Sequence, residues 1–236
     1  MRNTFDRFNG RHQDYQAARP SYAQEFLDWL GELYAPPERY TAADIGSGTG
    51  KLSAQLLAAG FRVCGVEPNP DMRGAAEALL GGDPRFSSSN GTDHDTGLPD
   101  RSVDMVAAAQ AFHWFDGPAF ARECRRILRP GGRAVLVWNV RGSAPMNQAL
   151  AQVFREHCPS FHGFTGGMGE DEPRIRDFFG GAYEKRRFPN PLTLDRDRFL
   201  RRCFSSSYAL REGDADYEAF RAALEALFDT FASGGQ

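Results

Sequence analysis

Short apolar runs alternate with amphipathic helical patterns between residues 40 and 140. The apolar runs predict five strands, at 40–45, 61–66, 85–87, 102–109 and 133–138. The helical patterns between them cover 51–59, 71–80 and 118–128. A chain that alternates strands and helices in this way builds βαβ units and a parallel α/β sheet. Because the run at 102–109 is largely apolar, we expect this strand near the sheet centre, buried on both faces.

Helical patterns dominate on either side of this core. An amphipathic helix is expected at 21–34, with Ser21 as its N-cap and Pro36-Pro37 as its stop. After residue 140 the pattern changes, and further helices are expected at 146–156, 196–204 and 216–232. One more strand is expected at 183–188, after a glycine-rich loop at 163–169.

Composition narrows the classes of protein that fit. The 236 residues carry 28 basic and 31 acidic side chains, a net charge of −3, so nucleic-acid binding through phosphate neutralisation is not expected. There is no apolar run of the ~20 residues that a membrane helix needs, and no apolar segment of the signal-peptide kind at the N-terminus. The four cysteines are scattered, which favours reduced thiols over disulfides or a zinc site. We therefore expect a cytoplasmic protein with no bound metal.

A glycine-rich turn follows the first expected strand and leads into a helix. Its sequence is Asp44-Ile45-Gly46-Ser47-Gly48-Thr49-Gly50. Glycine permits a positive φ and lets a ligand lie against the main chain. A phosphate-binding P-loop does not fit, because Lys51 is followed by leucine and position 45 is not glycine. The dinucleotide fingerprint G-x-G-x-x-G fits only in a degenerate form, and that alternative stays open.

Two carboxylates flank this turn and narrow the choice of ligand. Asp44 lies near the end of the first expected strand, and Glu67 follows the second. Open parallel sheets bind ligands at this edge. Asp44 repels a pyrophosphate but suits an ammonium group, and Glu67 can accept hydrogen bonds from two ribose hydroxyls. Together they indicate a ligand with a ribose, a positive amine and no phosphate, and S-adenosylmethionine is such a ligand.

Five segments, in order, resemble the motifs of class I S-adenosylmethionine-dependent methyltransferases, in the small-molecule group that includes trans-aconitate-methyltransferase-like enzymes. The segments are 43–50, 66–72, 97–106, 109–116 and 129–132. The resemblance implies a Rossmann-like, doubly wound, mostly parallel sheet with helices on both faces. It also implies transfer of a methyl group to a small molecule, through an oxygen, nitrogen or carbon atom that the sequence does not specify.

The resemblance assigns most of the candidate site to the cofactor. The cofactor-binding candidates are Asp44, Gly46, Ser47, Gly48, Gly50, Glu67, Pro68, Met72, Asp93, His94 and Gln110. Asp93 and His94 correspond to the adenine-binding positions, although the family often has an acidic residue where His94 stands. Met72 can equally be an ordinary core residue of its helix.

The remaining candidates belong to the lid and to the methyl acceptor. The stretch 15–22 resembles a segment that folds over the cofactor in the family, so the lid and substrate candidates are Tyr15, Arg19, Tyr22, Trp114 and Trp138. His113 is the candidate catalytic residue, as a general base for a hydroxyl or carboxyl acceptor. The alternative, which we favour, is that His113 and Trp114 shape the pocket floor. Methyl transfer from a sulfonium is downhill, so positioning and desolvation can supply most of the acceleration.

The chain also departs from the family pattern. The family sheet ordinarily ends with a sixth strand and a reversed seventh, whereas this sequence offers only 183–188. We expect the final strand to be absent, which implies a truncated chain or a partner, such as a second copy in a homodimer, over the sheet edge. The expected layout is one domain over 1–236, with an N-terminal lid and helix at 1–35, a cofactor-binding core at 40–140 and a helical substrate-side region at 141–236.

Two other classes of protein stay open. An NAD(P)-dependent oxidoreductase shares the ribose role of Glu67 but predicts a better dinucleotide fingerprint and no carboxylate at Asp44. A catalytically silent methyltransferase-like binding module is the other alternative, and the intact carboxylates and glycines of the turn argue against it. In each case the expected partner is a small molecule, with no nucleic acid and no membrane.

Overall fold

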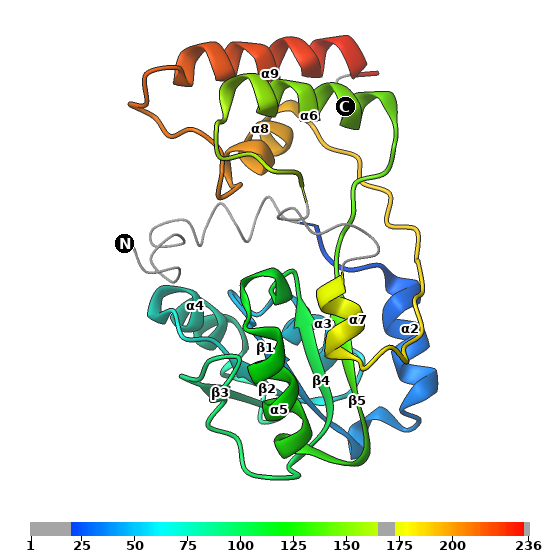
Figure 1. Cartoon of the computed structure of the whole chain (residues 1–236). Coiled ribbons are helices and arrows are strands. Elements are labelled where there is room, and N and C mark those ends of the chain that lie inside the picture. Colours follow the sequence, from blue (N-terminus) through cyan, green and yellow to red (C-terminus); the bar gives the residue numbers. More distant parts are fainter. Residues whose placement is uncertain (1–19, 165–172, 234–236) are drawn as a thin grey trace. The chain divides into compact units, whose positions relative to one another are not determined.

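The computed structural model describes residues 20–164 and 173–233, which form two compact units (Figure 1). Among these residues, unit 1 comprises Ser21–Asn139 and 173–190, and unit 2 comprises residue 20, 140–164 and 191–233. Tyr15 and Arg19 lie outside the described residues. The expectation of a single domain over 1–236 stays a prediction.

A five-stranded sheet forms the centre of unit 1. Its strands lie in the order β3-β2-β1-β4-β5, and each neighbouring pair is parallel. Their bounds are Thr41–Ile45 (β1), Arg62–Val66 (β2), Phe86–Ser89 (β3), Val103–Ala109 (β4) and Leu128–Val137 (β5). The order reverses at β1, so the predicted doubly wound α/β sheet is confirmed. The apolar strand β4 lies between β1 and β5, and five of its seven residues are buried, as expected.

Helices connect these strands and cover the sheet. Their bounds are Gln24–Leu33 (α2), Lys51–Ala58 (α3), Pro70–Leu80 (α4), Gly117–Ile127 (α5) and Pro173–Phe178 (α7), with 3₁₀ turns at Pro37–Arg39 (η2) and Phe112–Trp114 (η3). Right-handed crossovers put α3 and α5 on opposite faces, because their connections run to opposite sides of β1. Figure 1 shows α5 in front of the sheet and α3 behind it. The sequence pattern did not predict helix α7 or the two 3₁₀ turns.

Helix α2 begins later than the sequence pattern predicts. Its N-cap is Ala23, which makes no side-chain capping hydrogen bond, so the prediction that Ser21 caps the helix is wrong. Ser21 instead lies two residues outside, where its carbonyl oxygen accepts hydrogen bonds from Asn139 and Asn190. The buried face includes Phe26 and Leu30, which pack into the core with α3 and the sheet.

Strand β5 begins five residues earlier than predicted. The segment Arg129-Pro130-Gly131-Gly132, which was expected to end the preceding helix as a turn, forms an irregular part of the strand. Val103 pairs with Leu128 and Met105 pairs with Arg133, so the strand bulges between these two points. Gly131 takes a positive φ of 84°, and a Cβ on Gly132 would lie 2.9 Å from the Asp104 carbonyl oxygen. Glycines therefore permit the bulge.

The expected strand at 183–188 is wrong. Residues 182–195 form neither helix nor strand. The pattern that suggested a strand has another cause, because Phe188 packs against Phe26 and Trp29 with ring centroids 5.9 and 6.0 Å away. Arg186 lies over the ring of Trp29 at 5.1 Å. The segment is therefore held by aromatic contacts, and within the described residues the sheet has five strands.

Unit 2 is helical. Its helices are Pro145–His157 (α6), Arg196–Phe204 (α8) and Tyr217–Phe231 (α9), each within one residue of the predicted bounds. They enclose a core of their own, which includes Leu150, Phe154, Phe199, Phe220 and Leu224. Over the described part of the chain, none of the helices has the length and apolar content that crossing a membrane requires.

Three hydrogen bonds join places where the chain passes between the units. The chain enters unit 1 at Ser21 and leaves it after Asn139 and again after Asn190. The Asn190 side-chain amide donates to the Ser21 carbonyl oxygen and to the Asn139 side-chain oxygen, both at 2.8 Å. Asn139 Nδ2 donates to the same Ser21 oxygen at 3.3 Å. These three residues all belong to unit 1, so three of its segment ends are hydrogen-bonded to one another.

Candidate functional site

Two buried carboxylates lie at the carboxyl ends of adjacent strands. Asp44 precedes the last residue of β1 and Glu67 follows the last residue of β2, and the register pairs Ile45 with Val66. Asp44 is 1% exposed and Glu67 9% exposed. Since carboxyl ends of parallel strands meet at one edge, the two side chains belong to the same edge of the sheet, as the sequence predicted.

The glycine turn connects β1 to α3 and is fastened to the end of β2. The N–H groups of Gly46 and Ser47 both donate to the Val66 carbonyl oxygen, at 2.8 and 3.2 Å, and the N–H of Gly50 donates to the Ser47 carbonyl oxygen at 3.0 Å. Gly46, Gly48 and Gly50 have φ values of +68°, +57° and +81°. These are left-handed conformations that side chains with a Cβ rarely adopt, which is why the sequence needs glycine here.

Glu67 bridges the turn and the start of the next helix. Its Oε2 accepts a hydrogen bond from the Gly48 N–H and its Oε1 accepts one from the Asn69 N–H, both at 2.9 Å. Burial raises the pKa of Glu67, while these two hydrogen bonds and the charge of Arg73 oppose the rise. Each carboxylate oxygen has a second lone pair, so Glu67 keeps acceptor capacity for a ligand.

Asp44 is the most strongly buried ionisable group of this edge. Its Oδ2 accepts a hydrogen bond from the Ser53 hydroxyl at 2.7 Å. Its Oδ1 is buried and has no hydrogen-bond partner among the described residues, and the same holds for the Thr49 hydroxyl. Burial raises the pKa of Asp44 to about 6, although the Ser53 hydrogen bond lowers it. A buried acceptor without a partner is costly unless something else satisfies it.

The segment after Glu67 brings an apolar side chain to the turn. Asn69 caps α4, because its Oδ1 accepts hydrogen bonds from the N–H groups of Asp71 and Met72 at 3.0 and 3.1 Å. This cap fixes the first turn of α4, and the terminal methyl of buried Met72 lies 3.7 Å from the position that a Cβ on Gly48 would take. Pro68 is half-buried in the same segment. Met72 therefore lies against the turn.

Asp93 and His94 lie in the loop after β3. Asp93 Oδ2 accepts a hydrogen bond from the Asp116 N–H at 3.0 Å, and its Oδ1 lies 3.2 Å from His94 Nδ1. The His94 side chain is exposed, whereas that of Asp93 is mostly buried. The loop after β3 is therefore joined to the loop after β4, and Asp93 is the residue that joins them.

The loop after β4 carries the candidate catalytic residue. Gln110 has a φ of +55°, an uncommon conformation for a residue with a Cβ, and its side-chain amide donates to the Asn139 carbonyl oxygen at 3.2 Å. His113 and Trp114 lie on η3 with ring centroids 4.7 Å apart. Strained backbone of this kind clusters at functional sites.

Aromatic side chains support this loop. Phe112 of η3 is fully buried and contacts Trp138, which follows β5, with centroids 6.3 Å apart. The indole N–H of Trp138 is buried and has no hydrogen-bond partner within the described part of the chain. Trp138 therefore lies beside η3, and its indole N–H can donate a hydrogen bond to a ligand.

Several residues that organise the site were missed. Arg174 of α7 donates to the Phe115 carbonyl oxygen at 2.7 Å and lies 5.5 Å from the centroid of the Phe112 ring. It therefore fastens the loop that carries His113. Glu123 of α5 accepts hydrogen bonds from the N–H and hydroxyl of Thr96, at 2.9 and 2.6 Å, which fixes the segment that follows Asp93. In the sequence, nothing distinguishes Arg174 and Glu123 from ordinary surface charges.

One lid candidate has a different environment from the one expected. Tyr22 is buried in the core of unit 1, and its backbone N–H and carbonyl exchange hydrogen bonds with the Gln55 side chain at 2.9 Å. Its backbone is thus held to α3. A role for Tyr22 in a lid stays a prediction.

The turn offers a matched pair of substitutions. We expect Gly46→Ala to lower the free energy of unfolding by about 2 kcal/mol, because a Cβ there would lie 2.8 Å from the Ala111 Cβ and φ is positive. At Gly48 φ is similar, but the nearest atom would be 3.7 Å away, so Gly48→Ala should cost about 1 kcal/mol. Urea unfolding of both variants measures the difference. Equal losses would contradict the close packing of Gly46 against Ala111.

Metal ligands do not gather in the described residues. No group of three or more His, Cys, Asp or Glu side chains in residues 20–164 and 173–233 is arranged to hold a metal ion.

Comparison with known proteins finds a similarity to methyltransferases. A family model described as "Methyltransferase domain" matches residues 43–136. A methyltransferase of Mycobacterium tuberculosis is 42% identical over 127 residues, which are 54% of this chain and 49% of the relative. A methyltransferase of Schizosaccharomyces pombe is 31% identical over 147 residues, 61% of this chain and 57% of the relative. The chain thus spans about half the length of the curated relatives it matches.

Solved structures agree with this match. A structure from Anaeromyxobacter dehalogenans, assigned as a type II methyltransferase, has a TM-score of 0.59 and 29% identity and covers 90% of each chain. The YcgJ protein of Bacillus subtilis has a TM-score of 0.57 at 20% identity, covering 90% of this chain and 92% of its own, and supports the fold alone. The sheet order, the glycine turn and the matched residues define an α/β methyltransferase fold. Residues 43–136 are thus similar to a methyltransferase domain, and the chain has the fold of the class I methyltransferases.

Proposed function

We propose that this chain transfers the methyl group of S-adenosylmethionine to a small-molecule acceptor. The observation that carries the proposal is the pair of buried carboxylates, Asp44 and Glu67, on the two sides of the glycine turn. Two negative charges at this edge disfavour a pyrophosphate and favour a ligand with a positive amine and ribose hydroxyls. The match of residues 43–136 to a methyltransferase domain supports the same ligand.

The residues present fit this cofactor. Asp44 Oδ1 and the Thr49 hydroxyl are buried polar atoms without a partner among the described residues, so polar groups of a ligand can satisfy them. The three glycines leave the backbone of the turn open to close approach. In the proposed complex Asp44 and the turn, including Ser47, bind the amino-acid part, Glu67 binds the ribose, and Pro68 and Met72 contact the ribose or adenine.

The loops after β3 and β4 complete the proposed site. Asp93 and His94 are proposed to bind the adenine, and Asp93 also holds the Asp116 backbone. Gln110 is proposed to lie near the methionine end of the cofactor, since it directly follows β4. Tyr15 and Arg19 are proposed as lid residues with Tyr22.

The acceptor side of the proposed site is aromatic. Trp114 and Trp138 are proposed to contact the acceptor, and the buried Trp138 indole N–H can donate a hydrogen bond to it. The sulfonium of the cofactor supplies an activated methyl group. The protein residues then hold the acceptor atom in line and exclude water, which can supply most of the rate acceleration.

His113 has two proposed roles. As a general base, its imidazole takes the proton that a hydroxyl acceptor loses during methyl transfer. As a structural residue, it supports Trp114, whose ring centroid is 4.7 Å away. The close ring contact favours the structural role. The acceptor atom, a homodimer and a cytoplasmic location remain proposals.

A thermal-shift comparison tests the proposed cofactor. We expect S-adenosylhomocysteine to raise the unfolding temperature of the chain, since a ligand at 100 times its Kd stabilises the folded state by about 2.7 kcal/mol. NADH should leave the unfolding temperature unchanged, because the carboxylates of Asp44 and Glu67 repel its pyrophosphate. Stabilisation by NADH alone would instead support an oxidoreductase. A chain that binds S-adenosylhomocysteine but methylates no acceptor in a broad screen would support a catalytically silent binding module.

A further inference from the structure

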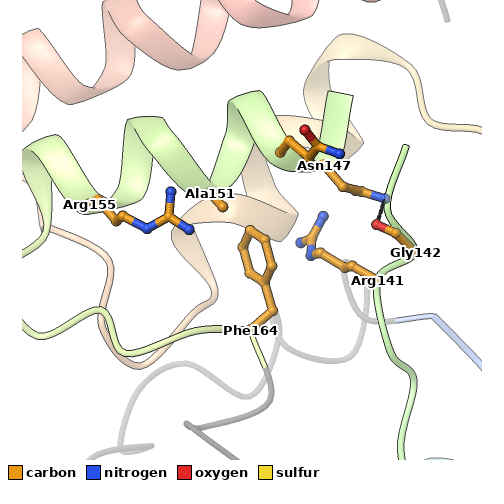
Figure 2. A pocket seen from close by; sticks show the side chains of 7 residues that line it. Arg141, Gly142, Asn147, Ala151, Arg155 and Phe164 are labelled. Atoms are coloured by element: carbon orange, nitrogen blue, oxygen red, sulfur yellow. Dashed lines mark hydrogen bonds between the residues drawn. The ribbon is translucent and has the colours of Figure 1, made fainter. Parts of the chain in front are cut away.

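Unit 2 contains a pocket beside α6 with a volume of about 340 Å³ (Figure 2). Its walls come from the segment before α6, from one side of α6 and from Phe164. The volume lies at the small end of the roughly 300–1,000 Å³ range of small-molecule sites. Every described residue that lines the pocket belongs to unit 2.

Arginine side chains contribute to the pocket wall. Arg141 and Arg155 both line it, and no acidic residue is among its described lining residues. Figure 2 shows the two guanidinium groups on either side of the Phe164 ring. Arg155 donates a hydrogen bond to the neutral Gln152 side chain at 3.2 Å, and it makes no ion pair with a described residue. The Arg155 guanidinium therefore favours an anionic ligand, and its planar fork suits a carboxylate.

An aromatic ring forms the apolar wall. The Arg141 guanidinium carbon lies 4.4 Å from the centroid of the Phe164 ring. The Phe164 ring also packs against the rings of Phe154 and Phe161, with centroids 5.8 and 5.1 Å away. Ala151 of α6 adds a small apolar surface. The pocket therefore offers a flat apolar surface beside the Arg155 guanidinium.

Side-chain amides of α6 form hydrogen bonds with the segment before α6, which is one wall of the pocket. Asn147 Nδ2 donates to the Gly142 carbonyl oxygen at 3.0 Å, and Gln148 Nε2 donates to the Ser143 carbonyl oxygen at 2.8 Å. These bonds fasten the segment that carries Arg141 to the first turn of α6. The pocket walls are therefore arranged before any ligand binds, as small-molecule sites usually are.

We infer that this pocket binds a small organic carboxylate with a flat, apolar body. Arg155 binds the carboxylate and the Phe164 ring contacts the body. The inference goes beyond the proposed function, because it needs neither the cofactor nor the glycine turn of unit 1.

Calorimetric titration of the whole chain tests the inference with benzoate, benzyl alcohol and inorganic phosphate. We expect benzoate to bind at least tenfold more tightly than benzyl alcohol, which has the ring but no charge, and more tightly than phosphate, which has the charge but no ring. Arg155→Gln should weaken benzoate binding about tenfold, since a hydrogen bond to a charged group is lost. Arg155→Lys, which keeps the charge without the planar fork, should give an intermediate affinity.

Arg198→Gln is the matched control, because Arg198 is an exposed helical arginine of unit 2 outside the pocket. It should bind benzoate like the unmodified chain. The inference is overturned if benzoate and benzyl alcohol bind equally, if phosphate binds as tightly as benzoate, or if Arg155→Gln and Arg198→Gln behave alike. Binding of S-adenosylhomocysteine, measured on the same samples, should be the same in all variants. A chain that binds benzoate but not S-adenosylhomocysteine contradicts only the proposed function.

Discussion

Asp44→Asn is expected to weaken the binding of S-adenosylhomocysteine about 10- to 100-fold while the chain stays folded. The Asp44 carboxylate is buried, and one of its oxygens has no partner among the described residues, so its charge is available to a ligand amine. A hydrogen bond between charged groups contributes about 1.5–3 kcal/mol, and each 1.4 kcal/mol is about tenfold in affinity. Calorimetric titration at pH 7.5 measures the loss.

The same variant should change the pH dependence of binding. Because burial raises the pKa of Asp44 to about 6, against the hydrogen bond from Ser53, the carboxylate is ionised above that pH and protonated below it. The affinity of the unmodified chain should therefore fall as the pH drops below about 6. Glu67, whose pKa burial also raises, remains in the variant. The part of the fall that belongs to Asp44 should be missing from Asp44→Asn.

Stability separates a binding effect from a folding effect. A carboxyl whose folded-state pKa is raised costs stability as the pH rises through that pKa, so ionised Asp44 destabilises the ligand-free fold at pH 7. Asp44→Asn removes this cost and should be at least as stable as the unmodified chain at pH 7. Ser53→Ala is the control, because it removes the hydrogen bond to Asp44 but keeps the charge. If Asp44→Asn bound S-adenosylhomocysteine normally, the proposed role of Asp44 would be wrong.

Glu123→Ala is expected to lower the free energy of unfolding by about 3 kcal/mol. The Glu123 side chain is 7% exposed and accepts hydrogen bonds from Thr96 and from the Nε and Nη2 atoms of Arg126 at 2.8 and 2.7 Å. Alanine leaves the buried N–H and hydroxyl of Thr96 without their acceptor. Urea unfolding at pH 7 measures the effect.

This stabilisation depends on pH in a defined direction. Burial raises the pKa of Glu123, but hydrogen bonds from Arg126 and Thr96 outweigh it and lower the pKa to about 2. A depressed carboxyl pKa stabilises the fold above the unfolded-state pKa, near ~4.3, and the contribution is lost as the pH falls toward 2. The difference in stability between the unmodified chain and Glu123→Ala should therefore shrink between about pH 4 and pH 2.

Asp100→Asn is the matched control for Glu123. Asp100 bonds the same guanidinium at 2.7 Å, but its side chain is 75% exposed. Exposed ion pairs contribute about 1 kcal/mol or less, so this variant should lose little stability at any pH. Comparable losses in the two variants would contradict the assignment of the stabilisation to the buried carboxylate.

The sheet and its ligand-binding edge could be predicted because local patterns determine them. Apolar runs located the five strands, and the positions of Asp44 and Glu67 at strand ends followed from chain order alone. The positive φ at Gly46, Gly48 and Gly50 followed from the tight turn between strand and helix. Each of these predictions rests on residues that are neighbours in sequence.

Contacts between distant segments could not be predicted in the same way. The hydrogen bond from Arg174 to Phe115 joins residues 59 positions apart, and the bonds from Thr96 to Glu123 span 27 positions. Nothing in the local pattern distinguishes these charges from exposed ones. The wrong prediction of a strand at 183–188 has the same origin. The apolar residue Phe188 suggested a strand, but it packs against α2, which lies far away in the sequence.

The hydrogen bonds among Ser21, Asn139 and Asn190 have a consequence for how this protein can evolve. The family match ends at residue 136, three positions before the chain leaves unit 1 at Asn139. Residue 20 and the segments 140–164 and 191–233 of unit 2 each adjoin one of these three residues, so insertions and deletions in them start beside a point that is fastened to unit 1. We expect such changes to leave the register of β1, β4 and β5 unchanged. Unit 2 can thus diverge or be exchanged between relatives while the sheet and its glycine turn are inherited unchanged.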